Sequence, residues 1–298
     1  MTTVDNAAAS DTPPKFVIKE VRMGDTWIWL QKGWADYRAA RMVSISYGLF
    51  FVVAGLFLTF GLVLTGLTYL ISPMIGGFLL IGPILGIGLC EISRDLEQGK
   101  TPTLWRAVTA FRRNVFHIMT AGLVLMIFMM IWVRIAVLIY VITFPYAVFS
   151  WENMITHALT SIDGFLLAVV GTAVGFGFAT VAFVFGVVSL PLMLDRKEDI
   201  FRAASVSFRA VLANRRTMAG WAAIIVLFIG AGFATGFLGL AVSLPLIGHA
   251  TWHAYRAMVV VEEPGSTSAD EDDINPQIPS APASEPKADQ DGFKGAGI

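Results

Sequence analysis

The sequence predicts an all-α fold: a polytopic transmembrane helix bundle of about six spans. Hydrophobic residues make up 56% of the chain and charged residues only 14%, whereas roughly 25% of the residues of a soluble domain are charged. Stretches such as 42–67 and 219–244 contain no charged residue, and each is longer than the roughly 18 apolar residues that mark a membrane-spanning helix. The mean hydropathy of +0.69 agrees with this. We therefore expect an integral membrane protein.

A second observation is internal repetition, because a basic amphipathic helix followed by an apolar hairpin occurs three times. The third copy is the clearest, since Phe201, Phe208 and Val211 share one helical face. An aromatic residue followed by arginine aligns the copies, at Tyr37-Arg38, Phe111-Arg112 and Phe208-Arg209. The returning half of each hairpin contains a proline: Pro83, Pro191 and Pro245. The middle copy is the longest, and we place its extra residues on the far side of the membrane.

Composition sets the domain boundaries. Residues 1–14 are polar and are predicted to form a disordered N-terminal tail, because they have too little apolar surface to offset the entropy of ordering. Residues 15–261 form the integral membrane domain, and residues 262–298 are predicted to be a disordered acidic C-terminal tail. The first residues lack the basic and apolar regions of a cleaved signal peptide. The internal spans should therefore drive membrane insertion.

The first copy begins with an amphipathic helix. Apolar residues fall at helical spacing with basic residues among them, as is typical of a helix in the headgroup layer: Trp27, Leu30, Trp34 and Tyr37. Residues 42–65 then form the first span and residues 67–92 the second. The second span contains Pro73, Pro83 and five glycines, so we expect it to be kinked or closely packed.

The third span covers residues 115–134. Arg134 follows Asn114 by 20 residues, which at 1.5 Å per residue is about 30 Å, the thickness of the hydrocarbon layer. We therefore expect Arg134 at the opposite interface. Residues 135–160 contain Pro145 and several interfacial aromatic residues, which favours an interfacial or re-entrant segment over the alternative of an extra pair of spans.

The remaining spans are predicted at 165–194, 218–239 and 241–261. Lysine and arginine gather in residues 15–41, 91–113 and 195–216, at Arg256 and in the C-terminal tail, and only Arg134 falls elsewhere. Because basic residues are retained on the cytoplasmic side, we expect a multi-pass protein with both termini in the cytoplasm.

Three histidines are the candidates for a metal or haem site. His249 and His253 are one helical turn apart, and His117 near the start of the third span could join them. The interpretation as interface anchors near a helix end is favoured, so no metal, cofactor or catalytic residue is predicted. The single cysteine, Cys90, excludes an internal disulfide and a multi-thiolate metal site. Motifs for nucleotide binding, zinc proteolysis or a serine nucleophile are not present either.

Exposed arginines of the basic segments are candidates for contact with anionic lipid headgroups, at about 1 kcal/mol per charge near the surface. They are Arg38, Arg41, Arg112, Arg113, Arg209, Arg215 and Arg216. Alternatively, these charges serve only to set the topology. Arg134 is a candidate functional charge within or at the edge of the membrane. The net charge of −1 gives no support for nucleic acid binding.

Three segments carry a resemblance to a known family: WLQKGWADYR, GLCEISRDLEQG and SLPLIGHATWHAYR. Over residues 16–261 the chain resembles a bacterial family of uncharacterised integral membrane proteins with a domain of unknown function, some of whose members are labelled cytochrome c oxidase subunit I. The resemblance implies six spans in the bacterial inner membrane and no established activity. The label does not suit this chain, because four histidines cannot supply the ligands of two haems and a copper. The chain is therefore not the catalytic subunit of a haem-copper oxidase.

Two classes of function remain open. A non-enzymatic scaffold or accessory protein, with a role in assembly beside a respiratory complex as one form, is favoured because the spans contain almost no charged residues. The alternative is a transporter of small solutes or lipids, which proline- and glycine-broken spans favour. The expected partners are the lipid bilayer, a membrane protein or a second copy of the chain. Charged residues lining a cavity at the midplane would favour transport, and an apolar bundle would favour the scaffold.

Overall fold

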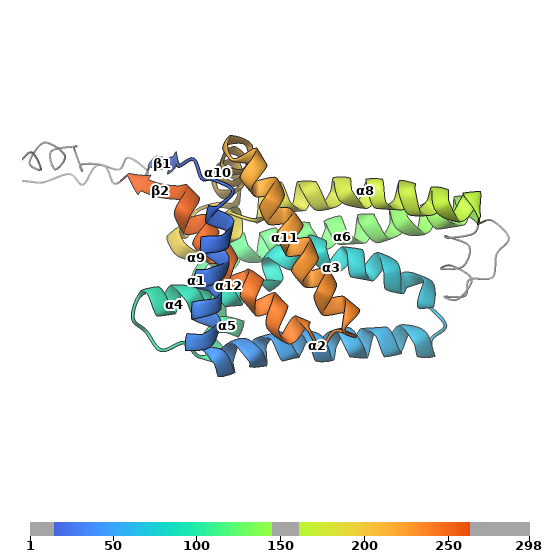
Figure 1. Cartoon of the computed structure of the whole chain (residues 1–298), viewed down its shortest axis with the longest axis horizontal. Helices are drawn as coiled ribbons and strands as arrows, with labels where there is room; N and C mark the ends of the chain where they lie inside the picture. The colour runs from blue at the N-terminus through green and yellow to red at the C-terminus, as the bar shows by residue number, and fades with distance from the viewer. Residues whose placement is uncertain (1–14, 145–160, 263–298) are drawn as a thin grey trace, which may run out of the picture. The chain divides into compact units, whose positions relative to one another are not determined.

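The computed structural model describes residues 15–144 and 161–262. Lys15 and Glu262 belong to a unit of their own, and these two residues form an ion pair of 3.5 Å. Phe16–Val261 forms the second unit, which is helical (Figure 1). The disordered tail expected at 1–14, all but Glu262 of the one expected at 262–298, and residues 145–160 of the interfacial or re-entrant segment expected at 135–160 lie outside the described residues.

The elements of the first half are β1 (Lys15–Ile18), α1 (Asp25–Ala39), α2 (Arg41–Leu64), the 3-10 helix η1 (Thr68–Leu70), α3 (Ile71–Leu85), α4 (Ile87–Glu97), α5 (Leu104–Val108) and the 3-10 helix η2 (Ala110–Asn114). Those of the second half are α6 (Val115–Thr143), α8 (Ile162–Gly186), α9 (Ser189–Arg196), α10 (Ile200–Ala213), α11 (Arg215–Ala234), α12 (Leu240–Met258) and β2 (Val259–Glu262). β1 and β2 pair as a two-stranded sheet.

Five helical segments of the described chain are long and apolar enough to cross a membrane: Arg41–Leu64, Thr68–Glu97, Ala110–Thr143, Ile162–Arg196 and Arg215–Ala234. They correspond to the first five predicted spans, and they confirm the all-α bundle. The sixth predicted span, 241–261, corresponds to α12, which is not among them. The count of six spans and the scheme of three repeats therefore stay predictions.

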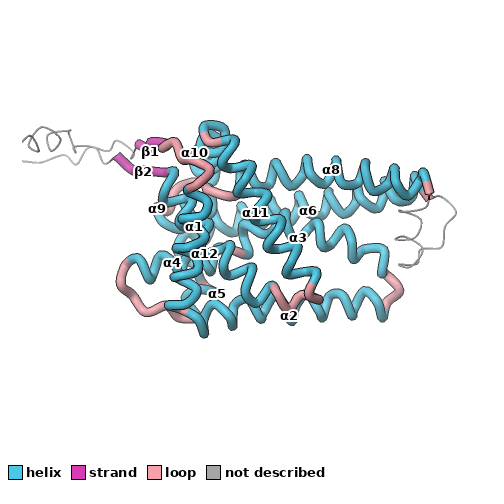
Figure 2. The backbone as a smooth tube through the Cα atoms, in the orientation of Figure 1, coloured by secondary structure: helices cyan, strands magenta, loops and turns pink. Residues whose placement is uncertain are grey.

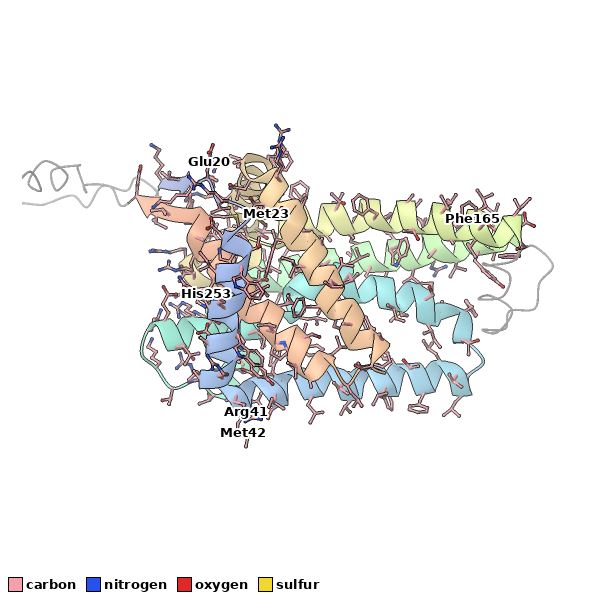
Figure 3. All side chains as sticks on the ribbon, in the orientation of Figure 1. Glu20, Met23, Arg41, Met42, Phe165 and His253 are labelled. Carbon is pink, nitrogen blue, oxygen red and sulfur yellow. The ribbon has the colours of Figure 1, made fainter. Side chains whose placement is uncertain are left out.

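The short helices and the ends of the long ones gather on one side of the bundle. Figure 2 shows α1, α4, α5, α9 and α10 together, with α2, α3, α6 and α8 extending away from them. Figure 3 places Arg41 and Phe165 toward opposite ends of the long helices. Within Phe16–Val261, the charged side chains of the described residues belong to the segments on the first side, except for Arg134 and Asp163. We call it the basic end.

α12 forms the centre of the fold, since 13 of its 19 residues are buried. α1 lies across α12 at close range, because Gly33 has no side chain: a Cβ there would lie 2.7 Å from the backbone nitrogen of Ala250. α2 approaches α12 in the same way, and a Cβ on Gly48 would lie 2.8 Å from the carbonyl oxygen of Ala241. Two glycines thus set the distance between α12 and the helices that flank it.

The returning helices of the first two hairpins are broken near the basic end. α3 contains Pro83 and ends at Leu85, and α4 starts after Gly86. Proline removes one backbone donor from a helix, so the break agrees with the kink predicted for the second span. α8 ends at Gly186, and α9 starts again at Ser189 with Pro191 in its first turn. Both breaks allow a short terminal helix to turn into the basic end.

The helix of the third predicted span extends beyond Arg134, the residue at which that span was expected to end, and the point where it leaves the membrane stays a prediction. α6 continues without a break to Thr143, and Arg134 is exposed on its side. Residues 135–143 are apolar and contain neither proline nor glycine, so nothing interrupts the helical hydrogen bonds before Pro145. The indole nitrogen of Trp132 donates to the carbonyl oxygen of Pro73 over 2.9 Å and holds α6 against α3.

Candidate functional site: an ionic junction of three helices

The C-terminal ends of α4, α9 and α12 meet at one carboxylate of the basic end, that of Asp195. Arg94 Nε donates to Oδ1 over 3.2 Å, and the Tyr255 hydroxyl donates to Oδ2 over 2.9 Å. Arg196 Nε and Arg256 Nη1 lie 3.6 and 3.7 Å from Oδ2. Because Arg94 comes from α4 and Tyr255 and Arg256 from α12, one side chain of α9 joins all three helices.

Glu97 makes a second connection between α4 and α12. Arg256 donates to Glu97 Oε1 from Nε over 3.1 Å and from Nη2 over 2.9 Å. The indole nitrogen of Trp252 donates to Oε2 over 2.9 Å. Both carboxylate oxygens of Glu97 are thus bonded to α12, although the Glu97 side chain is 42% exposed.

Glu91 and Asp95 lie one helical turn apart on α4 and are buried. Arg106 of α5 forms ion pairs with both carboxylates. Arg113 of η2 lies 3.3 Å from Glu91 Oε1 and also donates to the carbonyl oxygen of Leu194. Glu91 Oε2 and Asp95 Oδ2 have no hydrogen-bond partner among the described residues. Since a buried charge is costly unless it is paired, the arginines of α5 and η2 are required to keep α4 folded here.

The ionic junction is the set of these charged residues: Glu91, Arg94, Asp95, Glu97, Arg106, Arg113, Asp195, Arg196 and Arg256. Helical spacing explains the contribution of α4, because positions three and four apart lie on neighbouring faces. Local sequence also places Arg106, since the Thr103 hydroxyl accepts from the Arg106 backbone nitrogen and starts α5.

Two cavities lie next to each other along the three helices. A polar pocket of about 380 Å³ opens at the junction and is lined by Arg94, Glu97, Gln98, Asp195, Arg196, Trp252 and Arg256. An apolar cavity of about 100 Å³ is lined by residues such as Pro83, Cys90, Phe183, Pro191 and Ile247. Cys90 precedes Arg94, and Pro191 precedes Asp195, by one helical turn. The apolar cavity therefore lies about one turn deeper than the polar pocket.

The three candidate histidines are bonded to three different parts of the chain. His249 is fully buried, with Nε2 2.9 Å from the Ser44 hydroxyl and Nδ1 2.8 Å from the Ser93 hydroxyl. His253 Nε2 lies 2.8 Å from Asp36 Oδ2, and His117 Nδ1 accepts from the backbone nitrogen of Ile200. The described residues contain no group of three or more His, Cys, Asp or Glu side chains that could hold a metal ion.

Six of the seven candidate lipid-contacting arginines are exposed: Arg38, Arg41, Arg112, Arg209, Arg215 and Arg216. Arg112 also lies over the Trp105 ring, 5.7 Å from its centre. Arg113 differs, because its guanidinium turns inward to Glu91 and the backbone of α9. Arg134 lies on the exposed side of α6, away from the ionic junction.

Large apolar side chains of the three amphipathic segments point outward. We call this set the interfacial rim: Trp27, Ile28, Trp34, Leu104, Trp105, Val108, Phe201, Phe208 and Leu212. On α10 the buried face instead consists of smaller residues, namely Ala203, Val206, Ser207, Ala210 and Val211. Phe201 is 85% exposed. This side-chain arrangement suits helices that lie at the surface of a bilayer.

Residues 70–195 match the model of the DUF2189 family, described as a predicted integral membrane protein. The match identifies an uncharacterised integral membrane domain. Over residues 70–195 it confirms the predicted resemblance to uncharacterised integral membrane proteins, and it agrees with the bilayer as the environment of the chain. The DUF2189 segment runs from η1 to the end of α9 and includes Glu91, Arg94 and Asp195, whereas Trp252 and Arg256 lie outside it. No curated protein and no solved structure matches the chain.

Sequence reasoning did not assign the acidic members of the junction. Glu91 and Asp95 continue a long apolar stretch, and charged residues in such a position are costly and usually paired inside the protein. That signal, together with the four-residue spacing, could have marked α4 as the place where arginines converge. The arginine partners follow in the same basic segment, on α5 and η2.

Proposed function

We propose that this protein is a non-enzymatic membrane scaffold. The observation that carries the proposal is that charged and apolar residues occupy separate parts of the interior. Ion pairs join α4, α9 and α12 at the basic end. The described residues that line the apolar cavity include no charged residue. A scaffold needs a fixed arrangement of helices, and cross-helix ion pairs of this kind supply it.

The apolar cavity does not suit the transport of a hydrated solute. Transporters place polar binding groups near the bilayer midplane, between interrupted helices. Here the interrupted helices enclose only about 100 Å³, and the lining is apolar. The geometry thus favours the scaffold over the transport of a small hydrated solute, and transport of a lipid remains the alternative.

His249 and Cys90 are bonded to protein groups, which supports the proposal that these two residues do not take part in catalysis or in binding a haem or metal. Both ring nitrogens of His249 face serine hydroxyls. Ser44, Ser93 and His249 are buried, so a substrate has no direct access to the hydroxyls. Cys90 is buried as well, with its thiol 3.8 Å from the carbonyl oxygen of Gly248.

The interfacial rim supports a defined orientation of the protein in the membrane. Its aromatic and aliphatic side chains suit the headgroup boundary, and six exposed arginines accompany them. Under the rule that basic residues stay on the cytoplasmic side, the basic end faces the cytoplasm of a bacterium and both termini are cytoplasmic. Anionic headgroups of that leaflet are the lipid partners that the arginines fit.

Cross-linking in native membranes followed by mild-detergent isolation of the tagged protein tests the scaffold. We expect a stoichiometric membrane-protein partner or a homo-oligomer, and the identity of the partner shows whether a respiratory complex is involved. The isolated protein should be colourless. Flux of solutes or lipids through proteoliposomes, above that of protein-free vesicles, would overturn the proposal. So would a visible haem absorption band that is lost in His249→Ala.

A further inference from the structure

The ionic junction has one more positive charge than negative. Its five arginines are Arg94, Arg106, Arg113, Arg196 and Arg256, and its four carboxylates are Glu91, Asp95, Glu97 and Asp195. Arg106 pairs with Asp95, and Arg113 pairs with Glu91. Arg256 pairs with Glu97, and Arg94 pairs with Asp195. Arg196 therefore remains as the cation without a carboxylate of its own.

The geometry around Arg196 supports this assignment. Its Nε lies 3.6 Å from Asp195 Oδ2, which is longer than a charge-assisted hydrogen bond of about 2.7–2.9 Å. The same oxygen already accepts from the Tyr255 hydroxyl. The Arg196 side chain is 38% exposed and lines the polar pocket.

Arg94 supplies an independent observation in the same pocket. The residue is 91% buried, since its exposed fraction is 9%. Its Nε is bonded to Asp195, and its Nη1 is buried 4.0 Å from Glu91 Oε2, an ion pair without a hydrogen bond. A guanidinium has five donors in a fixed fork, and an unbonded buried donor is costly. Arg94 lines the polar pocket with the part of its guanidinium that does not face Glu91.

We propose that the pocket between α4, α9 and α12 binds one phosphate-type oxyanion. Arg196 and Arg94 are the residues that bind it, because the planar fork of arginine matches the oxygens of a phosphate group. The carboxylates of Glu97 and Asp195 repel an anion. A ligand therefore binds in this pocket only if it forms direct hydrogen bonds to the guanidinium groups. A pocket of about 380 Å³ has room for a phosphate group together with part of a larger molecule.

Two sources offer this chemistry: the headgroup of an anionic phospholipid and a free phosphate anion. The pocket lies at the basic end, where the exposed side chains of Glu97, Arg196 and Arg256 contribute to its lining. The interfacial rim belongs to the same end of the bundle. The test therefore has one arm for each source.

The first arm measures inorganic phosphate binding to the full chain in phosphatidylcholine nanodiscs by isothermal titration calorimetry. Wild-type protein should bind one phosphate. Arg196→Gln should bind about tenfold or more weakly, the loss expected for one charge-assisted hydrogen bond. Glu97→Gln should bind more tightly, because it removes an opposing charge. Arg209→Gln, at an exposed arginine of α10, is the matched control and should bind as the wild type does.

The second arm uses native mass spectrometry of protein loaded with phosphatidylglycerol. If the ligand is a lipid, the wild type and Arg209→Gln should retain one phosphatidylglycerol and Arg196→Gln should lose it. If the ligand is a free anion, phosphate should bind saturably in the first arm and no phosphatidylglycerol should be retained in the second. Opposite effects of Arg196→Gln and Glu97→Gln also exclude simple misfolding as the cause. If neither probe binds at a single site, or if Arg196→Gln behaves as Arg209→Gln does in both arms, the proposal is wrong. Because both arms use isolated protein, failure of the scaffold would leave this result unchanged.

Discussion

Asp195→Asn should loosen the contact between the three helices that meet at the basic end. The substitution removes the negative charge, and neutral hydrogen bonds replace the two bonds of 3.2 and 2.9 Å to the two carboxylate oxygens. The amide oxygen can accept from Arg94, and the amide nitrogen can donate to the Tyr255 hydroxyl. The side chains of Asp195 and Arg94 are only 12% and 11% exposed, so solvent screens the lost attraction weakly.

The expected loss of stability follows from the two hydrogen bonds. Bonds to charged groups contribute about 1.5–3 kcal/mol and neutral ones about 0.5–1.5 kcal/mol, so we expect Asp195→Asn to cost about 2–3 kcal/mol. Asp195→Ala should cost about 3–5 kcal/mol, because it leaves the buried Arg94 without a partner. A chain of this size loses about 2–4 °C per kcal/mol, which gives a drop of about 4–12 °C for Asn.

Thermal unfolding of the detergent-solubilised protein, followed by tryptophan fluorescence, measures this loss. Glu20→Gln is the control, because Glu20 is exposed and lies outside the junction, and it should change stability by less than about 0.5 kcal/mol. A double-mutant cycle with Arg94→Gln should give a coupling of about 1–3 kcal/mol. An Asp195→Asn midpoint equal to that of Glu20→Gln, with zero coupling to Arg94, would refute the role of Asp195 in joining the helices.

Two further substitutions test the packing around α12. Gly33→Val should destabilise the protein by about 1–3 kcal/mol or more, because its Cβ would lie 2.7 Å from the Ala250 nitrogen. Gly171→Val is the control and should be tolerated, since nothing lies within 4 Å of that position. Equal unfolding midpoints for the two variants would contradict the close approach of α1. His249→Ala should cost about 2–4 kcal/mol, since it leaves two buried serine hydroxyls unbonded. His253→Ala, on the same helix but partly exposed, should cost less than half of that in the same melt, and the reverse order would contradict the assigned burial.

The fold class was predictable because composition and periodicity act locally. Uncharged stretches longer than a bilayer crossing identify the long helices, and Pro83 with Gly86 marks the break between α3 and α4. The end of α6 was less accessible, since Arg134 alone suggested an interface and the helix continues until the apolar run meets Pro145. One polar residue does not end a helix when its backbone hydrogen bonds are intact.

The ionic junction was not predictable from one sequence, because its bonds join distant segments. Arg94 and Asp195 are 101 residues apart, and Glu97 and Arg256 are 159 apart. Spacing places Glu91, Arg94 and Asp95 on α4, but it does not say which arginine meets which carboxylate. Arg113 shows the consequence: by sequence it resembles its neighbour Arg112, yet one is turned inward and the other is exposed.

Labelling of single cysteines with a membrane-impermeant maleimide tests the arrangement of charge across the bilayer most directly. Lys100→Cys and Lys197→Cys lie at the basic end, and Ile162→Cys lies at the start of α8, where the side chain is 86% exposed. With Cys90 replaced by serine, we predict that the two lysine positions are labelled from the same side of membrane vesicles that contain the protein, and position 162 only from the other side. Labelling of all three from one side would contradict the gathering of the arginines and lysines on a single membrane face.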